Sequence, residues 1–123
     1  MLNARQRFGK TGESLAVKKL VSSGYAILEK NFRAKPGEID IIAKDKEAIV
    51  FVEVKSRKTK SYGNPKYSIT PGKQRKISMA ALAYLKQKKL MKKKARFDVV
   101  IIHADNNNHK IELIKNAFDL NYG

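Results

Sequence analysis

The sequence contains no cysteine, only three prolines, and no run of apolar residues that approaches the length of a membrane span. Without cysteine, disulfides and thiolate metal sites are excluded. A bilayer-spanning helix needs about 20 consecutive apolar residues, and the first ten residues also lack an apolar stretch of signal-peptide length. There is no internal repeat and no linker rich in glycine or proline. We therefore expect one globular domain over residues 1–123 with a cytoplasmic location.

Acidic residues are also scarce, numbering 11 against 27 lysines and arginines, which gives a formal net charge of +16. Between Lys55 and Arg96 there are 15 basic residues and no acidic one, so the rest of the chain is almost neutral. Such a segregated positive charge favours a polyanionic partner, because each cation that neutralises a phosphate releases condensed counterions. Nucleic acid is the leading partner. A solvated face and an anionic membrane surface are the alternatives, and the second is disfavoured because no helix combines a basic face with a broad apolar one.

Hydrophobic periodicity predicts a small α/β fold, with helices packed on a mixed sheet of about five strands. The predicted order is helix, three strands, helix and two strands, at residues 12–24, 25–32, 38–43, 48–55, 71–85, 97–103 and 110–114.

Local signals mark the ends of several of these elements. Thr11 is a candidate N-cap and Gly24 a candidate stop for the first helix, and residues 35–37, Lys-Pro-Gly, predict a turn. Thr70 and Pro71 form an N-cap and first-turn pair that predicts the start of the second helix. Residues 56–70 before this helix are predicted to be a long basic loop.

Charged residues interrupt two apolar strands in the segment "GEIDIIAKDKEAIVFVEVKSR". Alternation places Glu53 and Lys55 on one face of their strand, and a hairpin turn at residues 46–47 would set Asp40 directly opposite Glu53. Opposed Cβ atoms lie about 4.5 to 5.5 Å apart, where two carboxylates repel by roughly 3 kcal/mol at an effective dielectric near 20. The pair therefore needs either a compensating cation or a raised pKa, and a divalent ion with oxygen ligands is the natural candidate. Two alternatives stay open: a three-residue loop would shift the register, and Lys55 would pair with Glu38 in a purely structural interaction.

Both predicted helices add polar residues to this hypothesis. Glu13 shares the apolar stripe of the first helix, so we expect it to project toward the sheet as a third acid. Gln74 lies on the inward stripe of the second helix, beside Lys73, Arg75 and Lys76, at a helix start that favours phosphate. The alternative roles are a first-turn acid for Glu13 and a helix-start residue for Gln74.

The motifs "GESLA", "GEIDIIA", "VFVEVKSR" and "RFDVVII" resemble those of the bacterial YraN family, and the resemblance covers essentially the whole chain. That family is counted among restriction-endonuclease-like proteins, so the resemblance implies this fold. An acid, a spacer and Glu-x-Lys also resemble the PD-(D/E)XK nuclease signature, with archaeal Holliday junction resolvases as functional analogues. One departure is Ile39, which stands where the signature has proline.

This resemblance implies a role for each matching residue. Asp40, Glu53 and Glu13 would bind Mg²⁺ or Mn²⁺, with Glu13 as an outer ligand or general base. Lys55 would orient the attacking water, and Gln74 would be the polar residue of the second helix.

Taken together, the residues and the resemblance predict a Mg²⁺-dependent nuclease, with DNA favoured over RNA as substrate. Cutting that is structure-selective or nonspecific is expected rather than recognition of a base sequence. We expect phosphate contacts from Arg57, Lys58, Lys60, Lys73, Gln74, Arg75 and Lys76. The rival hypothesis is a nucleic-acid-binding protein with the same fold that does not cleave. A homodimer is compatible with either reading.

Overall fold

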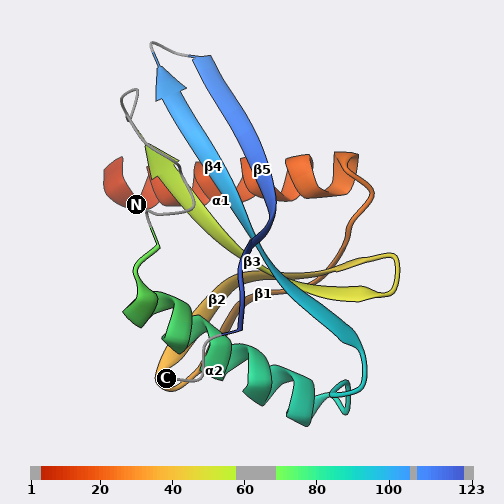
Figure 1. The fold of residues 1–123 in the computed structure, drawn as a ribbon. Coiled ribbons are helices and arrows are strands. Elements are labelled where there is room, and N and C mark those ends of the chain that lie inside the picture. The colour runs from red at the N-terminus through yellow and green to blue at the C-terminus, as the bar shows by residue number, and fades with distance from the viewer. Residues whose placement is uncertain (1–3, 58–68, 106–107, 121–123) are drawn as a thin grey trace.

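The computed structural model describes residues 4–57, 69–105 and 108–120. Its elements follow the predicted order (Figure 1), and they are α1 (Ala4–Ser22), β1 (Ala26–Ala34), β2 (Gly37–Asp45), β3 (Ala48–Arg57), α2 (Pro71–Gln87), β4 (Lys94–Asp105) and β5 (Asn108–Phe118). The α/β class and the mixed sheet are therefore confirmed. Most of the predicted basic loop, residues 58–68, lies outside the described residues.

The five strands form one sheet in the order β1-β2-β3-β4-β5. All neighbours are antiparallel except β3 and β4, which are parallel and are joined through α2, as parallel pairs require. Between β2 and β3, Ile41 pairs with Val52 and Asp45 with Ala48, which confirms the register expected for a turn at residues 46–47.

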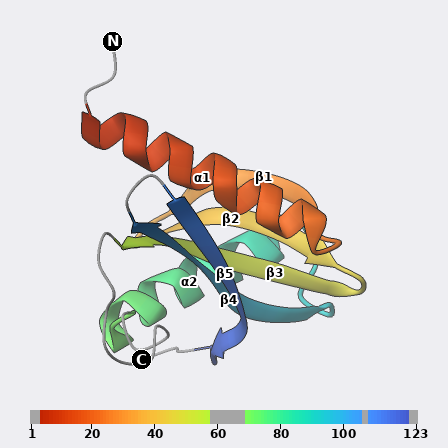
Figure 2. The same cartoon turned by 90° about the horizontal axis from the view of Figure 1, so that it is seen from above.

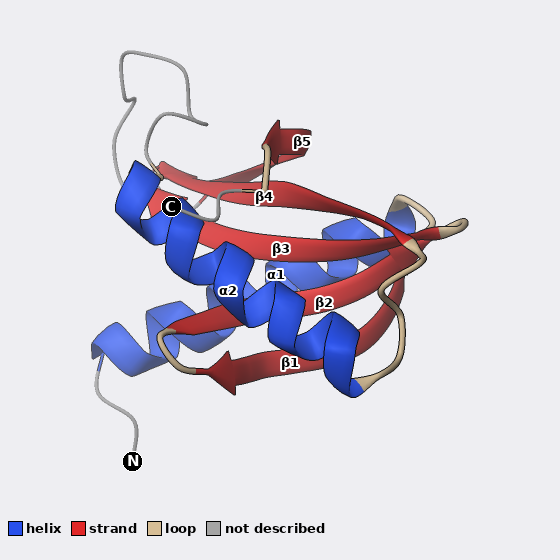
Figure 3. Cartoon of the chain, turned by 60° about the horizontal axis from the view of Figure 1, so that its bottom comes forward, coloured by secondary structure: helices blue, strands red, loops and turns tan. Residues whose placement is uncertain are grey.

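The two helices cover opposite faces of the sheet (Figures 2 and 3). On one face α2 packs on a core that includes Phe51, Phe97 and Tyr84. On the other, Ala16 and Leu20 of α1 pack on a second core. The central strands thus contribute side chains to both cores, which explains their almost continuous apolar sequences.

The first helix begins at Ala4 rather than at residue 12. Thr11 therefore lies inside α1, and its prediction as an N-cap is wrong, because residues 4–7 are good helix formers that extend the helix backward. The predicted end is close to the observed one. The helix stops at Ser22, and Gly24 has a φ of 94°, a conformation that glycine adopts without strain.

The start of α2 follows its sequence signals. Thr70 accepts a hydrogen bond from the Lys73 N–H at 3.2 Å, and Pro71 occupies the first turn. This confirms the predicted cap. The predicted apolar stripe is buried as expected, and its members are Ile77, Ala80, Ala81, Tyr84 and Leu85.

A glycine at the start of β2 permits close contact with α2. A Cβ atom at Gly37 would overlap the backbone carbonyl of Lys76. No larger residue fits there unless the helix moves. Gly37 therefore sets how closely the first half of α2 approaches the sheet.

A buried polar network ties β4 to segments that are distant in the sequence. Asp98, fully buried on β4, accepts hydrogen bonds from the Tyr25 hydroxyl at 2.7 Å, the Arg96 Nε at 3.0 Å and the Asn116 N–H at 2.9 Å. Arg96 Nη2 also lies 2.7 Å from Asp45 Oδ2. The pKa of the Tyr25 hydroxyl is raised, mainly because the group is buried and secondly because it lies against Asp98. The network thus provides hydrogen-bond partners for the buried Asp98 carboxylate. It also gives a partner to the Asn116 N–H, which lies where the pairing of β4 and β5 is irregular.

Among the described residues, neither helix is long and apolar enough to cross a membrane.

Candidate functional site

A pocket of about 430 Å³ opens where β2 and β3 meet the first turns of α2. Three carboxyl groups and two lysines face it. Its lining residues are Pro36, Gly37, Glu38, Asp40, Glu53, Thr70, Gly72, Lys73, Lys76 and Ile77. Asp40 and Glu53, the two strand acids singled out in the sequence, therefore converge on one cavity that is accessible from solvent.

Asp40 lies on β2 in a half-buried position. It directly precedes Ile41, which pairs with Val52 of β3. Its Oδ2 accepts a hydrogen bond from the Val54 N–H at 2.8 Å. Burial first, and then the negative charge of Glu53, raises the pKa of Asp40 from 3.8 to about 7. The Val54 N–H and Lys73 oppose this shift without cancelling it. The two acids thus repel each other as predicted, and the repulsion is only partly compensated.

The cation nearest to these acids comes from α2. Lys73 Nζ lies 2.8 Å from Glu53 Oε1, and their side chains are 47% and 7% exposed. Burial lowers the pKa of Lys73, but the hydrogen bond to Glu53 and the charges of Glu53 and Asp40 outweigh it, so the net shift is upward. Lys73 was predicted only as a phosphate contact. Its position beside Glu53 depends on how α2 docks, and no sequence pattern reveals that.

Lys55 is half-buried on β3, beside Ile101 of β4, and is not among the residues that line the pocket. Glu38, its alternative structural partner, instead lies 3.6 Å from Arg33 on β1. The role that the resemblance implies for Lys55 stays a prediction.

Glu13 does not lie where the helical stripe suggested. Its Oε1 is 3.4 Å from Asn31 Nδ2 and 3.9 Å from Lys30 Nζ, and it does not line the pocket. The expectation assumed that both helices cover the same face of the sheet, whereas α1 packs on the face away from α2. Of the stripe expected at Ala16, Val17, Leu20 and Val21, Ala16 and Leu20 are fully buried as predicted, whereas Val21 is 54% exposed and its inward placement is wrong.

Apart from Lys73, the predicted phosphate-binding residues fall into three groups. Gln74 donates through Nε2 to the Ile69 carbonyl at 2.9 Å, which matches its alternative role as a helix-start residue. Lys76 lines the pocket, and Arg75 is exposed next to it. Arg57 ends β3, whereas Lys58 and Lys60 lie outside the described residues.

Comparison with known proteins identifies the family. The model of "Uncharacterised protein family UPF0102" matches residues 12–102. This chain belongs to the UPF0102 (YraN) family. A UPF0102 protein of Desulfosudis oleivorans is 54% identical over 98% of this chain and 97% of its own length. Relatives from Syntrophus aciditrophicus and Geotalea daltonii are each 51% identical, and they cover 95% and 98% of this chain and 92% and 95% of their own.

One solved structure also resembles this UPF0102 chain. The crystal structure of SSO0001 matches 91% of the chain with a TM-score of 0.36 and 15% identity. The chain spans about half of that protein, 52% of its length.

The pocket of this UPF0102 protein has the donor set of a hard divalent cation. Mg²⁺ in proteins typically takes one or two carboxylates and completes its shell with water and phosphate oxygens. Asp40 and Glu53 supply two such groups, and their mutual repulsion favours a cation between them. Within the described part of the chain no group of three or more histidine, aspartate or glutamate side chains is arranged to hold a metal ion. Asp40 and Glu53 are the two acids that could serve as ligands.

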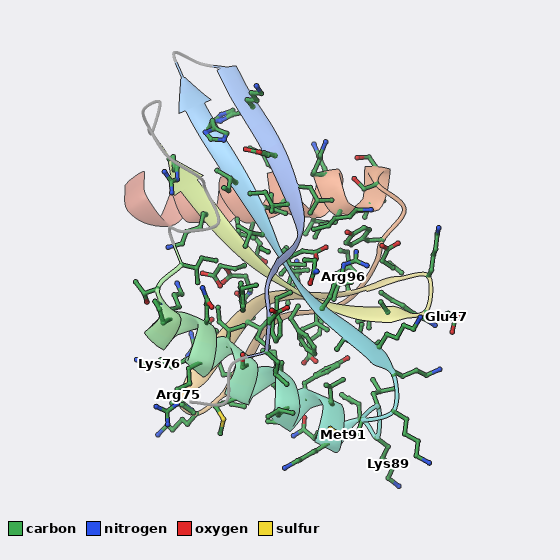
Figure 4. All side chains as sticks on the ribbon, in the orientation of Figure 1. Glu47, Arg75, Lys76, Lys89, Met91 and Arg96 are labelled. Carbon is green, nitrogen blue, oxygen red and sulfur yellow. The ribbon has the colours of Figure 1, made fainter. Side chains whose placement is uncertain are left out.

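Six lysines surround the other end of α2, and we call residues 86–94 the lysine corner. Lys86, Lys88, Lys89, Lys92, Lys93 and Lys94 are all exposed, and in the described residues none of them forms an ion pair. Figure 4 shows Arg75 and Lys76 at one end of α2 and Lys89 at the other. The 17 residues of α2 make it roughly 25 Å long. Positive charge therefore brackets the helix, with one end at the pocket.

Proposed function

We propose that this UPF0102 protein hydrolyses phosphodiester bonds of nucleic acid with the help of a divalent cation. One observation carries the proposal. Asp40 and Glu53 converge, only partly compensated, in a solvent-accessible pocket beside two lysines at the first turns of α2. Acids kept close together against their repulsion are typical of sites that bind a metal ion.

The carboxylates of Asp40 and Glu53 would hold the ion. A bound Mg²⁺ or Mn²⁺ supplies Lewis acidity that polarises a phosphoryl oxygen and lowers the pKa of a bound water. The Val54 N–H would fix the orientation of Asp40. Lys76 and the amino end of α2 would attract the substrate phosphate. Lys55 would orient the water, as the PD-(D/E)XK resemblance implies.

The charge distribution supports a polynucleotide rather than a small phosphate ester. Basic residues occur at the pocket and at the lysine corner, at opposite ends of α2, and a polyanion is long enough to contact both. Such contacts with the backbone give affinity without base specificity. DNA is the favoured substrate and selection for branched structure the favoured mode, on the resemblance to Holliday junction resolvases.

The test is cleavage of labelled duplex, single-stranded and branched DNA and of RNA in the presence of Mn²⁺. We expect products with the unmodified protein and at least a roughly hundred-fold lower rate with Glu53→Gln, which removes a ligand charge. Glu47→Gln is the matched control, because Glu47 lies exposed in the β2–β3 turn, away from the pocket (Figure 4). Equal cleavage by all three proteins would assign the activity to a contaminant or to another site.

A second candidate function is binding of nucleic acid without cleavage. It is favoured by the ion pair between Lys73 and Glu53, which already compensates one of the two acids. This hypothesis predicts binding that is indifferent to EDTA and to Glu53→Gln, with no product from any substrate. The same set of substrates therefore separates the two functions.

A further inference from the structure

The two members of the ion pair between Lys73 and Glu53 have very different access to water. The Glu53 side chain is 7% exposed and the Lys73 side chain 47%. Glu53 is fixed in the middle of β3, whereas Lys73 reaches it from the first turn of a helix on another layer. The lysine is therefore much more accessible to solvent than the carboxylate that it holds.

A buried carboxylate needs a compensating positive charge, and Lys73 supplies it at 2.8 Å. A divalent ion bound between Asp40 and Glu53 would supply the same compensation from the same side. An ammonium group and a metal ion repel each other, and Oε1 of Glu53 cannot serve both at full strength. The two cations are thus alternatives.

We infer that Lys73 is a built-in counter-cation that competes with the divalent ion for Glu53 and so lowers the affinity of the carboxylate pair for metal. The inference rests on the proposed metal site. It concerns the affinity of that site and the movement of the lysine, not the reaction itself. On metal binding, the Lys73 ammonium leaves Glu53 and becomes available at the pocket mouth for an anion.

Lys76 provides an internal comparison. It lines the same pocket from a position three residues beyond Lys73 on α2, but no ion pair joins it to Asp40 or Glu53 in the described structure. Lys76 and Lys73 carry the same charge. Only Lys73 holds the carboxylate oxygen, so a specific competition and a general electrostatic effect predict different results.

The experiment is calorimetric titration of Mn²⁺ alone into the purified protein and its variants, with no nucleic acid. Lys73→Met keeps the aliphatic stem and removes the charge, and we expect Mn²⁺ affinity to rise roughly ten-fold or more, the size of one charge-assisted hydrogen bond. Lys76→Met should change affinity by less than about three-fold, because an exposed charge that does not touch the acids acts through solvent. Lys73→Arg, which retains the charge, should bind Mn²⁺ as weakly as the unmodified protein.

Melting provides a second readout. Without metal, Lys73→Met should melt lower, because Glu53 is left buried without its cation, and Mn²⁺ should raise its melting temperature more than that of the unmodified protein. If Lys73→Met does not fold, Lys73→Gln offers Glu53 a neutral hydrogen-bond donor and carries the same expectation for Mn²⁺ affinity.

The outcomes separate this inference from the proposed function. Equal Mn²⁺ affinity in the unmodified protein and Lys73→Met, or equal gains in Lys73→Met and Lys76→Met, overturns the competition and leaves the metal site standing. Absence of Mn²⁺ binding in every protein, or binding that Asp40→Asn does not weaken, overturns the proposed metal site itself.

Discussion

Replacing Asp40 by asparagine should stabilise the metal-free protein, although it removes a hydrogen-bonded carboxylate from the pocket. The asparagine amide is neutral at every pH, and its oxygen still accepts the Val54 N–H that Asp40 binds at 2.8 Å. What disappears is the repulsion with Glu53 and the cost of burying a second charge. The expected gain follows from the pKa of Asp40.

Burial and Glu53 raise the pKa of Asp40 from 3.8 to about 7 in the folded protein, and unfolding restores the lower value. Between these two pH values the folded state holds a proton that the unfolded state has released. The free energy of unfolding therefore falls as pH rises, by about 1.4 kcal/mol per pH unit. Over the whole window the loss reaches about 4 kcal/mol, and it is complete above pH 7.

Asp40→Asn should escape this loss. In urea unfolding followed by circular dichroism in EDTA, we expect a gain of between about 1 and 4 kcal/mol at pH 8, with the upper value as the limit set by linkage. From pH 8 to pH 5 the gain should shrink by up to about 3 kcal/mol. Asp119→Asn is the matched control, because Asp119 is exposed after the end of β5.

A variant that is less stable than the unmodified protein at pH 8, or whose gain does not change between pH 5 and pH 8, would refute the reasoning. Either result would mean that Asp40 is already compensated without metal. Mn²⁺ supplies an independent check, since it should stabilise the unmodified protein at pH 8 and have little effect on Asp40→Asn.

Three further predictions test other parts of the structure. Gly37→Ala should lower the free energy of unfolding by about 1 to 3 kcal/mol, because its methyl group would overlap the Lys76 carbonyl. Gly72→Ala, with open space around it, should be neutral or slightly stabilising, and equal urea midpoints for the two variants would contradict this. Asp98→Ala should lower the free energy of unfolding by at least about 3 kcal/mol, because Arg96 and Tyr25 would lose their buried acceptor. A smaller loss would show that the network rearranges. Neutralising four lysines of the lysine corner should weaken DNA binding measured by fluorescence anisotropy. The slope of log affinity against log salt concentration should flatten by about 0.9 for each phosphate that is no longer neutralised. Unchanged binding would mean that DNA contacts another surface.

Local chemistry was sufficient to predict the two strands that carry the acids. A turn at residues 46–47 fixes the register of its hairpin, and strand alternation then sets Asp40 and Glu53 on one face. The cap at Thr70 likewise depends only on residues within one helical turn. These features depend on short stretches of chain, so the sequence predicted them correctly.

The buried network was missed for a different reason. Arg96 and Asp98 alternate at the start of an otherwise apolar strand, which is the same signal that identified Asp40 and Glu53. Their partners Tyr25 and Asn116 are far away in the chain. The signal was present, but without the fold nothing distinguished a structural acid from a functional one.

The sequence by itself determined the order of elements, the facing of the two strands that carry Asp40 and Glu53, and the segregation of positive charge, because periodicity and turn chemistry act over a few residues. Only the tertiary structure decided which helix covers which face. That placement took Glu13 to the edge of β1 and brought Lys73 to Glu53. Helix docking is set by the packing of two separate cores and by the close approach at Gly37, and residues distant in the chain make both.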